Sequence, residues 1–335
     1  MRYIIYGAGA IGGVVGGRLF AAGKETTLIC RGRHLDAIRD RGLLLREPGG
    51  DRSLPVPAVG SPAELDFSDQ DIVILTMKAQ DTSAALDDLE AAGGRDVAIV
   101  CCQNGVANER IAARRFARVY AMLVALPATF MEPGVVLGWS APIAGVLDVG
   151  CFPHGSDALC DRIGADFAAA GFVCRPDPAV MRLKYAKLMT NLGNGLDALT
   201  TFNRSDEPFR AVMRALTQEA TACFNAAGIA YTPRDEYNQH VSRHTSWGEI
   251  PGAKRGGSST WQSLSKGSRR LEVDYLNGEI VLLGRLHGVP TPYNAAVRRL
   301  AQQLAAEGGD PGSYGIADVE ALAARLGAMA PAPAD

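Results

Sequence analysis

The sequence lacks the features that mark several classes of protein. Its 34 basic and 36 acidic side chains leave a net charge of −2, so no charge excess points to a nucleic acid or another polyanion as partner. Its seven cysteines form no C-x-x-C pair and no zinc-type spacing. They are odd in number and several lie in apolar runs, which predicts reduced, buried thiols in a reducing compartment.

Long hydrophobic segments are also missing. The longest apolar stretch, residues 119–131, is too short to span a bilayer and is interrupted by Pro127. Met1 and Arg2 lead at once into a short strand-like run, without the apolar region or the cleavage site of a secretory signal. We therefore expect a cytoplasmic protein that has no membrane partner.

The residues that are present suffice for two domains with sizeable cores, since 47% of the 335 residues are hydrophobic and 21% are charged. In the first half, short runs rich in Val, Ile and Leu alternate with helix-like segments such as residues 11–22. These runs are continuously apolar, which predicts parallel strands covered on both faces. The predicted fold is a doubly wound, Rossmann-type α/β domain with strands at residues 2–6, 26–30, 71–77, 97–102 and 119–126.

The pattern changes near Asp177 and Pro178, after which helical periodicity dominates. Helices are predicted over residues 208–227 and 272–287, and a third begins at Thr291–Pro292 and runs through 304. We therefore predict an α/β domain over residues 1–177, an all-helical domain over 178–307 and a C-terminal tail over 308–335. Within the tail, we expect a short helix at 318–326 and a frayed end at 331–335.

A glycine motif directly follows the first predicted strand. Residues 7–12 read Gly7-Ala8-Gly9-Ala10-Ile11-Gly12, the G-x-G-x-x-G pattern, and they open a predicted helix. In that context the three glycines permit a tight turn, a close approach to a pyrophosphate and close helix–sheet packing. The helix N-terminus supplies N–H groups to the anion. The motif predicts a dinucleotide site, and the alternative is a glycine turn that binds nothing.

The end of the second predicted strand bears on which dinucleotide is bound. NAD sites place an acidic residue there, about 20 residues after the glycines. This chain has Arg31 and Arg33 instead, and the next carboxylate is Asp36. Because guanidinium groups match a 2′-phosphate, we expect NADP(H). The alternative is that both arginines are solvated loop charges.

Further candidates follow other predicted strands and lie on one predicted helix. Lys78 and Asn104 come after two strands, at the edge where parallel sheets bind ligands, although a turn charge and an Asx turn explain them equally. Lys187 and Asn191 are i,i+4 neighbours with Asn194 close by, so a helix would present them together. An ammonium and two amides facing a cleft would suit a small oxo acid, whereas an exposed helix face needs no function.

Three other groups of residues carry possible ligands. Ser259 lies in a small hydroxyl-rich turn, and Glu272 opens a helix that it could cap. Glu236, His240 and His244 have the i,i+4,i+8 spacing of metal ligands, but no further ligand pattern supports them. We predict no metal site.

In their order along the chain, these segments resemble the ketopantoate reductases (2-dehydropantoate 2-reductases), NADPH-dependent enzymes of pantothenate synthesis. The resemblance covers residues 1 to about 304. The glycine motif is shared with many families. The lysine–asparagine helix joined to residues 272–278, Glu-Val-Asp-Tyr-Leu-Asn-Gly, is far more specific.

The resemblance implies a role for each candidate. Lys187 matches the proton donor, and Glu272 matches the acid that holds the substrate and the nicotinamide ribose region. We predict both as catalytic residues. The predicted substrate-binding residues are Asn104, Asn191, Asn194 and Ser259, and the predicted cofactor-binding residues are Gly7, Ala8, Gly9, Ala10, Ile11, Gly12, Arg31, Lys78, Asn104 and Glu272.

Two departures from the family pattern lie on the substrate side. The second asparagine, Asn194, comes three residues after Asn191 where the family commonly has four, and the stretch from Ser259 to Glu272 looks one residue longer. We therefore expect NADPH-dependent reduction of a small 2-oxo acid, with ketopantoate as the leading substrate. The alternatives are a paralogue that reduces another 2-oxo acid and a non-catalytic NADP(H) sensor. Pairing into a homodimer is left open.

Overall fold

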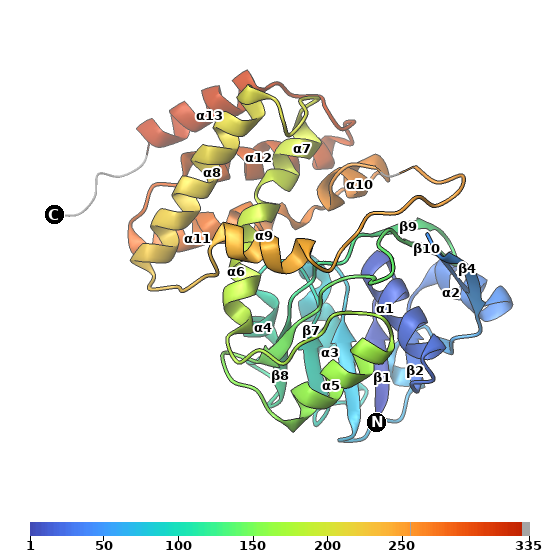
Figure 1. Cartoon of the computed structure of the whole chain (residues 1–335). Coiled ribbons are helices and arrows are strands. Elements are labelled where there is room, and N and C mark those ends of the chain that lie inside the picture. Colours follow the sequence, from blue (N-terminus) through green and yellow to red (C-terminus); the bar gives the residue numbers. More distant parts are fainter. Residues whose placement is uncertain (255, 330–335) are drawn as a thin grey trace. The chain divides into compact units, whose positions relative to one another are not determined.

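The computed structural model describes residues 1–254 and 256–329, and the frayed end expected at 331–335 lies outside them. This part of the chain (Figure 1) divides into two compact units. The first comprises Met1–Lys184 with Thr232–Lys254, and the second comprises Tyr185–Tyr231 with the described residues from 256 onward. The domain limits expected from the sequence stay a prediction, and residues 232–254 belong to the first unit.

The first unit is built on a seven-stranded sheet with the strand order β11-β8-β7-β6-β1-β2-β5. All neighbouring strands are parallel except β11, which runs antiparallel to β8 at one end of the sheet. The Rossmann-type prediction is confirmed, although the antiparallel edge strand was not expected. The strands are β1 (Arg2–Tyr6), β2 (Thr26–Ile29), β5 (Ala58–Val59), β6 (Asp71–Leu75), β7 (Ala98–Cys101), β8 (Val119–Met122) and β11 (Val149–Cys151).

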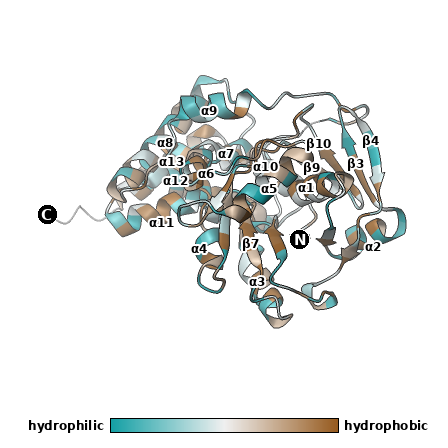
Figure 2. Cartoon of the chain, turned by 60° about the horizontal axis from the view of Figure 1, so that its bottom comes forward, coloured by the Kyte–Doolittle hydropathy of each residue, from teal (hydrophilic) through white to brown (hydrophobic). Residues whose placement is uncertain are grey.

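Both faces of this sheet are covered. Along β1, Tyr3 and Ile5 belong to one hydrophobic core, whereas Ile4 and Tyr6 belong to another, because successive side chains point to opposite faces. Helices α1 (Ala10–Ala21) and α5 (Ala158–Ala169) contribute to the first core, and α3 (Thr82–Ala91) and α4 (Asn108–Ala112) to the second. Figure 2 shows brown, hydrophobic residues along β7 and α1. The continuously apolar runs are therefore strands covered on both faces, as predicted.

A smaller sheet beside α1 was not predicted. Its strand order is β4-β3-β10-β9, with β3 parallel to β10 and the outer pairs antiparallel. Helix α1 contacts β3, β9 and β10, so this sheet closes the side of the first core. The strands are β3 (Leu43–Glu47), β4 (Gly50–Leu54), β9 (Ala128–Glu132) and β10 (Val135–Gly138), and the remaining helices of this region are α2 (Gly32–Arg41), η1 (Pro62–Glu64) and η2 (Ala79–Asp81).

Helix α9 (Arg234–Ser242) carries His240, and His244 follows it; the sequence gives both the spacing of metal ligands. His240 Nε2 lies 2.5 Å from Asp148 Oδ2, and His244 Nε2 lies 3.4 Å from the guanidinium of Arg175. These contacts tie α9 to the strand-rich part of the first unit, and Glu236 is not among the partners of either ring.

The second unit is helical, as predicted. Helix α6 (Val180–Asn191) begins in the first unit and ends in the second. Helix α12 packs against α7, α8, α11 and α13, and so lies at the centre. The elements are α7 (Gly193–Leu199), α8 (Glu207–Ala226), α10 (Ser259–Ser265), η3 (Glu272–Tyr275), α11 (Asn277–His287), α12 (Pro292–Glu307) and α13 (Ile316–Ala328).

The helix expected over residues 272–287 is interrupted. Leu276 has φ −112° and ψ −89°, which separates η3 from α11. The next residue, Asn277, is fully buried and donates from Nδ2 to Leu192 O and to Asn294 Oδ1, both at 3.1 Å. Because a buried amide needs its hydrogen bonds, Asn277 fixes the junction, and the prediction of one continuous helix was wrong at this point.

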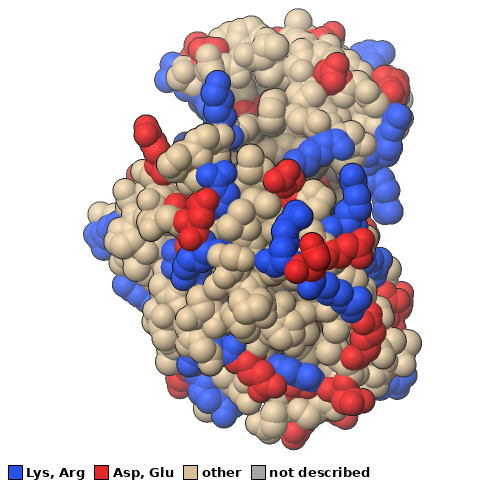
Figure 3. Space-filling view, turned by 90° about the vertical axis from the view of Figure 1, so that its right-hand side faces the viewer, with Lys and Arg blue, Asp and Glu red and all other residues tan. Residues whose placement is uncertain are grey.

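The surface carries charges of both signs. Over the face that Figure 3 shows, Lys and Arg are interspersed with Asp and Glu, and this face presents no extended patch of one sign. Across the described ranges 1–254 and 256–329, no helix has the length and apolar character that crossing a membrane requires.

Candidate active site

The glycine loop is held by the two strands beside β1. Gly7 N and Ala8 N donate to Ile29 O at the end of β2, at 2.9 and 3.3 Å. On the other side, Thr76 Oγ1 after β6 donates to Gly7 O at 2.8 Å. The loop is therefore fixed in place before any ligand arrives.

Gly9 and Gly12 are required for different reasons. A Cβ on Gly12 would lie 2.3 Å from Gly7 O, so only glycine lets α1 pack this closely on the loop. A Cβ on Gly9 would meet nothing within 4 Å. The protein itself leaves room at Gly9, and no side chain caps the N-terminus of α1 there. Free N–H groups and open space at a helix start are what a pyrophosphate needs, so the loop fits a dinucleotide.

His34 supports the loop from α2, and the sequence analysis missed it. Gly134 N donates to His34 Nδ1 at 2.9 Å, so the ring proton is on Nε2, which donates to Ala8 O at 2.7 Å. Burial lowers the pKa of His34, although the bond to Ala8 O opposes that shift. The neutral ring is thus the form that holds the loop. No sequence signal links His34 to Gly134, which lies 100 residues away.

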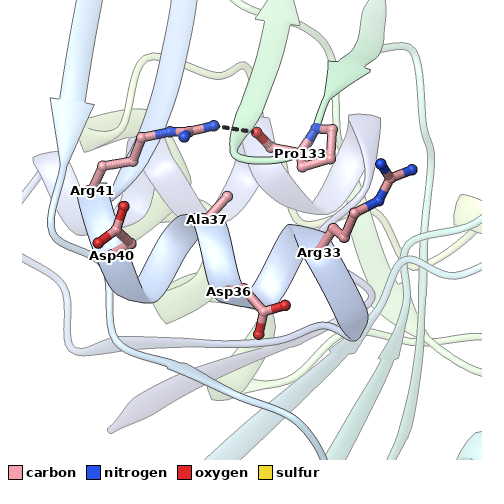
Figure 4. A pocket seen from close by; sticks show the side chains of 6 residues that line it. All are labelled: Arg33, Asp36, Ala37, Asp40, Arg41 and Pro133. Atoms are coloured by element: carbon pink, nitrogen blue, oxygen red, sulfur yellow. Dashed lines mark hydrogen bonds between the residues drawn. The ribbon is translucent and has the colours of Figure 1, made fainter.

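Arg31 and Arg33 both reach solvent at the end of β2. Arg31 Nη2 lies 3.1 Å from Asp88 Oδ2, but its side chain is 69% exposed, so this pair is weak and its guanidinium is available to a ligand. Arg33 is exposed on α2, and none of the described residues forms an ion pair with it. It lines a shallow surface pocket in which Arg41 donates to Pro133 O at 2.9 Å (Figure 4). The other lining residues are Asp36, Ala37 and Asp40.

Lys78 follows β6, which lies next to β1 in the sheet, and Asn104 follows β7, which lies next to β6. The structure therefore brings both to the same edge as the glycine loop, as predicted for parallel strands. Gln103 Nε2 joins the two segments by donating to Met77 O and to Thr82 Oγ1, each at 2.9 Å. Asn104 Oδ1 is buried and accepts no hydrogen bond within the described chain. An unpaired buried acceptor is costly, which fits a donor supplied by a ligand.

A buried ion pair at the same sheet edge was also missed. Lys184 on α6 and Glu109 on α4 are 2% and 0% exposed, and Nζ lies 2.6 Å from Oε1. Lys184 Nζ also donates to Gln103 O at 2.9 Å and to the carbonyls of Cys101 and Met122 at 3.2 Å. The ammonium therefore ties α6 to the ends of β7 and β8.

In the second unit, Lys187 and Asn191 lie on α6 at i,i+4, and Asn194 lies on α7. Burial lowers the pKa of Lys187 to about 8, and the positive charge of Arg204 adds to the shift. Asn191 is buried, and its Nδ2 donates to no described acceptor. A lysine with this pKa can give up a proton near neutral pH, unlike an ordinary surface lysine.

Asn194 and Ser259 meet in a cluster that includes a cation missed by the sequence analysis. Asn194 Nδ2 lies 3.5 Å from Ser259 Oγ, and Arg204 Nη2 donates to Asn194 Oδ1 at 3.2 Å. Asp197 holds the turn through Ser258 N at 2.8 Å. Nothing in the sequence marks Arg204, which lies in a loop. Glu272 is buried at the start of η3, and this element packs against α11 and α12.

Comparisons with known proteins give the family. Residues 3–153 match the model described as ketopantoate reductase PanE/ApbA, and residues 179–305 match the model of its C-terminal part. The chain belongs to the ketopantoate reductase family. This confirms the resemblance stated from the sequence, and with it an oxidoreductase of Rossmann-type fold.

Relatives match along nearly the whole chain. It is 29% identical over 340 residues to a 2-dehydropantoate 2-reductase of Mesorhizobium japonicum and 26% identical over 316 residues to one of Pyrococcus horikoshii, each time covering 92% of this chain and 99% of the relative. A crystal structure of a PanE/ApbA family ketopantoate reductase from Ralstonia eutropha JMP134 aligns with a TM-score of 0.77 and 29% identity, over 92% of this chain and 99% of that one.

A second solved structure shares the fold at lower identity. D-mandelate dehydrogenase with NADH and anilino(oxo)acetate aligns with a TM-score of 0.78 and 22% identity, over 96% of this chain and 99% of that one. At this identity the likeness concerns the fold alone.

Proposed function

We propose that this chain reduces a 2-oxo acid to a 2-hydroxy acid with NADPH, and that 2-dehydropantoate is the substrate. The observation that carries the proposal is Lys187, a lysine with a pKa near 8 that shares a helix face with Asn191. Family membership and the relatives named 2-dehydropantoate 2-reductase support the substrate. The α/β and helical domains, expected over residues 1–177 and 178–307, would bind the cofactor and the substrate respectively.

The cofactor would be held by residues 7–12 together with Arg31, Lys78, Asn104 and Glu272. NADPH, when bound, supplies the hydride. We favour NADP(H) over NAD(H) because β2 is followed by exposed guanidiniums rather than by a carboxylate. Arg31 and Arg33 would form ion pairs with the 2′-phosphate, whereas the neutral 2′-hydroxyl of NAD(H) offers no charge for the two guanidinium groups to pair with.

The protein's own residues would carry the proton and the orientation of the substrate. Negative charge develops on the carbonyl oxygen during reduction, and Lys187 would stabilise it and then donate its proton. Asn191, Asn194 and Ser259 would bind the substrate by hydrogen bonds, and Arg204 would pair with its carboxylate. Glu272 would orient the substrate. We also propose that the enzyme works in the cytoplasm on a free small molecule.

The test is NADPH oxidation with ketopantoate by the wild type and by Lys187→Ala, with NADPH affinity measured alongside. Loss of the proton donor should lower turnover by about 10²-fold or more while NADPH still binds. Lys254→Ala, at an exposed lysine, is the matched control and should behave as the wild type. Wild-type turnover in Lys187→Ala would contradict the proton-donor assignment.

A panel of 2-oxo acids addresses the substrate. If a bulkier oxo acid has the higher kcat/KM, the shifted spacing at Asn194 accompanies a different specificity. Absence of turnover over the whole panel, together with tight NADPH binding, would favour the sensor.

The cofactor preference is tested at Arg31 and Arg33. Substitution of each by alanine should raise the KM for NADPH about tenfold or more and leave that for NADH nearly unchanged, because only NADPH carries the extra phosphate. Equal effects on both would contradict NADP(H) selection.

A further inference from the structure

Two thiols and a carboxylate converge at the far edge of the large sheet. The ligand atoms of Cys151, Asp157 and Cys160 all lie within 4.8 Å of one another. Cys151 ends β11, Cys160 lies in the first turn of α5, and Asp157 is the N-cap residue of that helix. Among the described residues, no other set of three His, Cys, Asp or Glu side chains converges in this way.

Hydrogen bonds from neighbouring residues fix the Asp157 carboxyl group beside the two thiols. Asp157 Oδ1 accepts from the N–H groups of Leu159 and Cys160 at 2.9 and 3.0 Å, and Oδ2 accepts from Tyr120 at 2.8 Å.

We propose that Cys151, Asp157 and Cys160 form a binding site for a soft divalent cation of the zinc class, with water as the fourth ligand. Tetrahedral zinc with sulfur at about 2.3 Å and oxygen at about 2.0 Å places two sulfurs about 3.8 Å apart and a sulfur and an oxygen about 3.5 Å apart. The ligand atoms lie within 4.8 Å of one another, so they need to approach by at most about 1.3 Å. Thiolate and carboxylate donors are ones that zinc accepts.

A bound divalent cation deprotonates a coordinating thiol outright. Binding of Zn²⁺ therefore breaks two S–H bonds, forms two Zn–S bonds and releases two protons.

The site is remote from the glycine loop. Cys151 pairs in register with Tyr120 near the start of β8, whereas Gly7 follows the end of β1, and β8 and β1 run in the same direction. The two features therefore lie at opposite edges of the sheet. We expect the cation to stabilise β11 and α5 and to leave hydride transfer unchanged, so the outcome is independent of the proposed reductase activity.

The experiment titrates the reduced, metal-free full chain with Zn²⁺ alone by calorimetry, and with Co²⁺ alone by absorption. We expect one Zn²⁺ to bind per chain. The binding heat should depend on the ionisation enthalpy of the buffer, because the buffer takes up the two released protons. With Co²⁺ we expect a thiolate-to-Co²⁺ charge-transfer band. Cys151→Ser and Cys160→Ser should each abolish the band. Asp157→Asn retains a helix-capping oxygen and should weaken Zn²⁺ binding by at least about tenfold. Cys223→Ala, which removes a buried thiol of the second unit, is the control and should bind as the wild type.

Three results would overturn the proposal. The first is no Zn²⁺ uptake by the folded wild type. The second is unchanged uptake in both serine variants, whose folding circular dichroism would verify. The third is formation of a Cys151–Cys160 disulfide under mild diamide without cation binding, which would make the pair a redox site.

Discussion

Removal of the Lys184 ammonium should destabilise the first unit strongly. Its partner carboxylate on Glu109 is 0% exposed, so Lys184→Met leaves a charge that water cannot reach. Breaking a buried pair from one side costs about 3–5 kcal/mol. A loss of about 4 kcal/mol lowers the folding equilibrium constant roughly 10³-fold. Three carbonyl oxygens, those of Cys101, Gln103 and Met122, lose a donor at the same time.

The assay is equilibrium urea unfolding of each variant, followed by circular dichroism and by tryptophan fluorescence. Lys184→Met should shift the unfolding transition of the first unit to a markedly lower urea concentration. The double variant Lys184→Met/Glu109→Leu should recover most of the loss, because a buried ion pair can be replaced by apolar residues at little cost. Arg39→Met provides the matched control, since the side chains of Arg39 and Glu64 are 49% and 45% exposed. Its cost should be at most about 1 kcal/mol.

Two outcomes would refute this reasoning. One is a loss of less than about 1 kcal/mol in the free energy of unfolding of Lys184→Met, which would mean that Glu109 is hydrated or protonated at little cost in the variant. The other is a double variant as unstable as the single one, which would mean that the bonds to the strand carbonyls, and not the charge pairing, carry the energy.

Three further predictions concern the site. Gly9→Ala should leave the stability within about 0.5 kcal/mol of the wild type, because the added Cβ meets only open space, but it should raise the Kd for NADPH strongly, because the Cβ enters the space proposed for the pyrophosphate. Gly12→Ala should instead lower the melting temperature, because its Cβ would clash with Gly7 O. Equal losses of stability in the two variants would contradict this prediction. The kcat/KM for reduction should fall as the pH rises through about 8, because only protonated Lys187 donates, and Lys187→Arg should move that limb to higher pH; a pH profile that is the same in both proteins would exclude Lys187. Substitution of His34 by Phe should weaken NADPH binding without changing the KM for the oxo acid, because its ring holds Ala8 O at 2.7 Å; unchanged NADPH affinity in calorimetry would remove His34 from the cofactor site.

Much of the large sheet could be predicted because its signal is local. A strand buried on both faces must be apolar at every position, as β6 is over Asp71–Leu75 except at its first residue. The smaller sheet has no such signal. Strand β4 is exposed at four of its five residues, and β3 finds its partner β10 about 90 residues further along the chain. Pairing at that distance depends on the folded core and not on local pattern.

The site residues also differ in whether a local sequence pattern could predict them. The glycine loop was found because its spacing is fixed by backbone geometry over six residues. Glu109 and His34 act through partners 75 and 100 residues away, which one sequence cannot pair. Lys184 does have a local signal in the sequence, because it lies on the same buried face of α6 as Val180, Leu188 and Asn191. A cation at a core position of a helix predicts a buried carboxylate elsewhere.

Helix α6 shows why residue type alone could not separate a structural lysine from a functional one. Lys184 and Lys187 are one turn apart; Lys184 is fully buried, and Lys187 is partly buried. Lys184 lies 2.6 Å from the carboxylate of Glu109 and donates to three carbonyls at the strand ends, which is a structural role. Lys187 feels burial and the positive charge of Arg204, both of which favour the neutral amine. An ammonium that must hold a structure together needs the first environment, and one that must donate its proton needs the second. Arg204→Ala should therefore raise the kinetic pKa of Lys187, and the same substitution should leave the stability contributed by Lys184 and Glu109 unchanged.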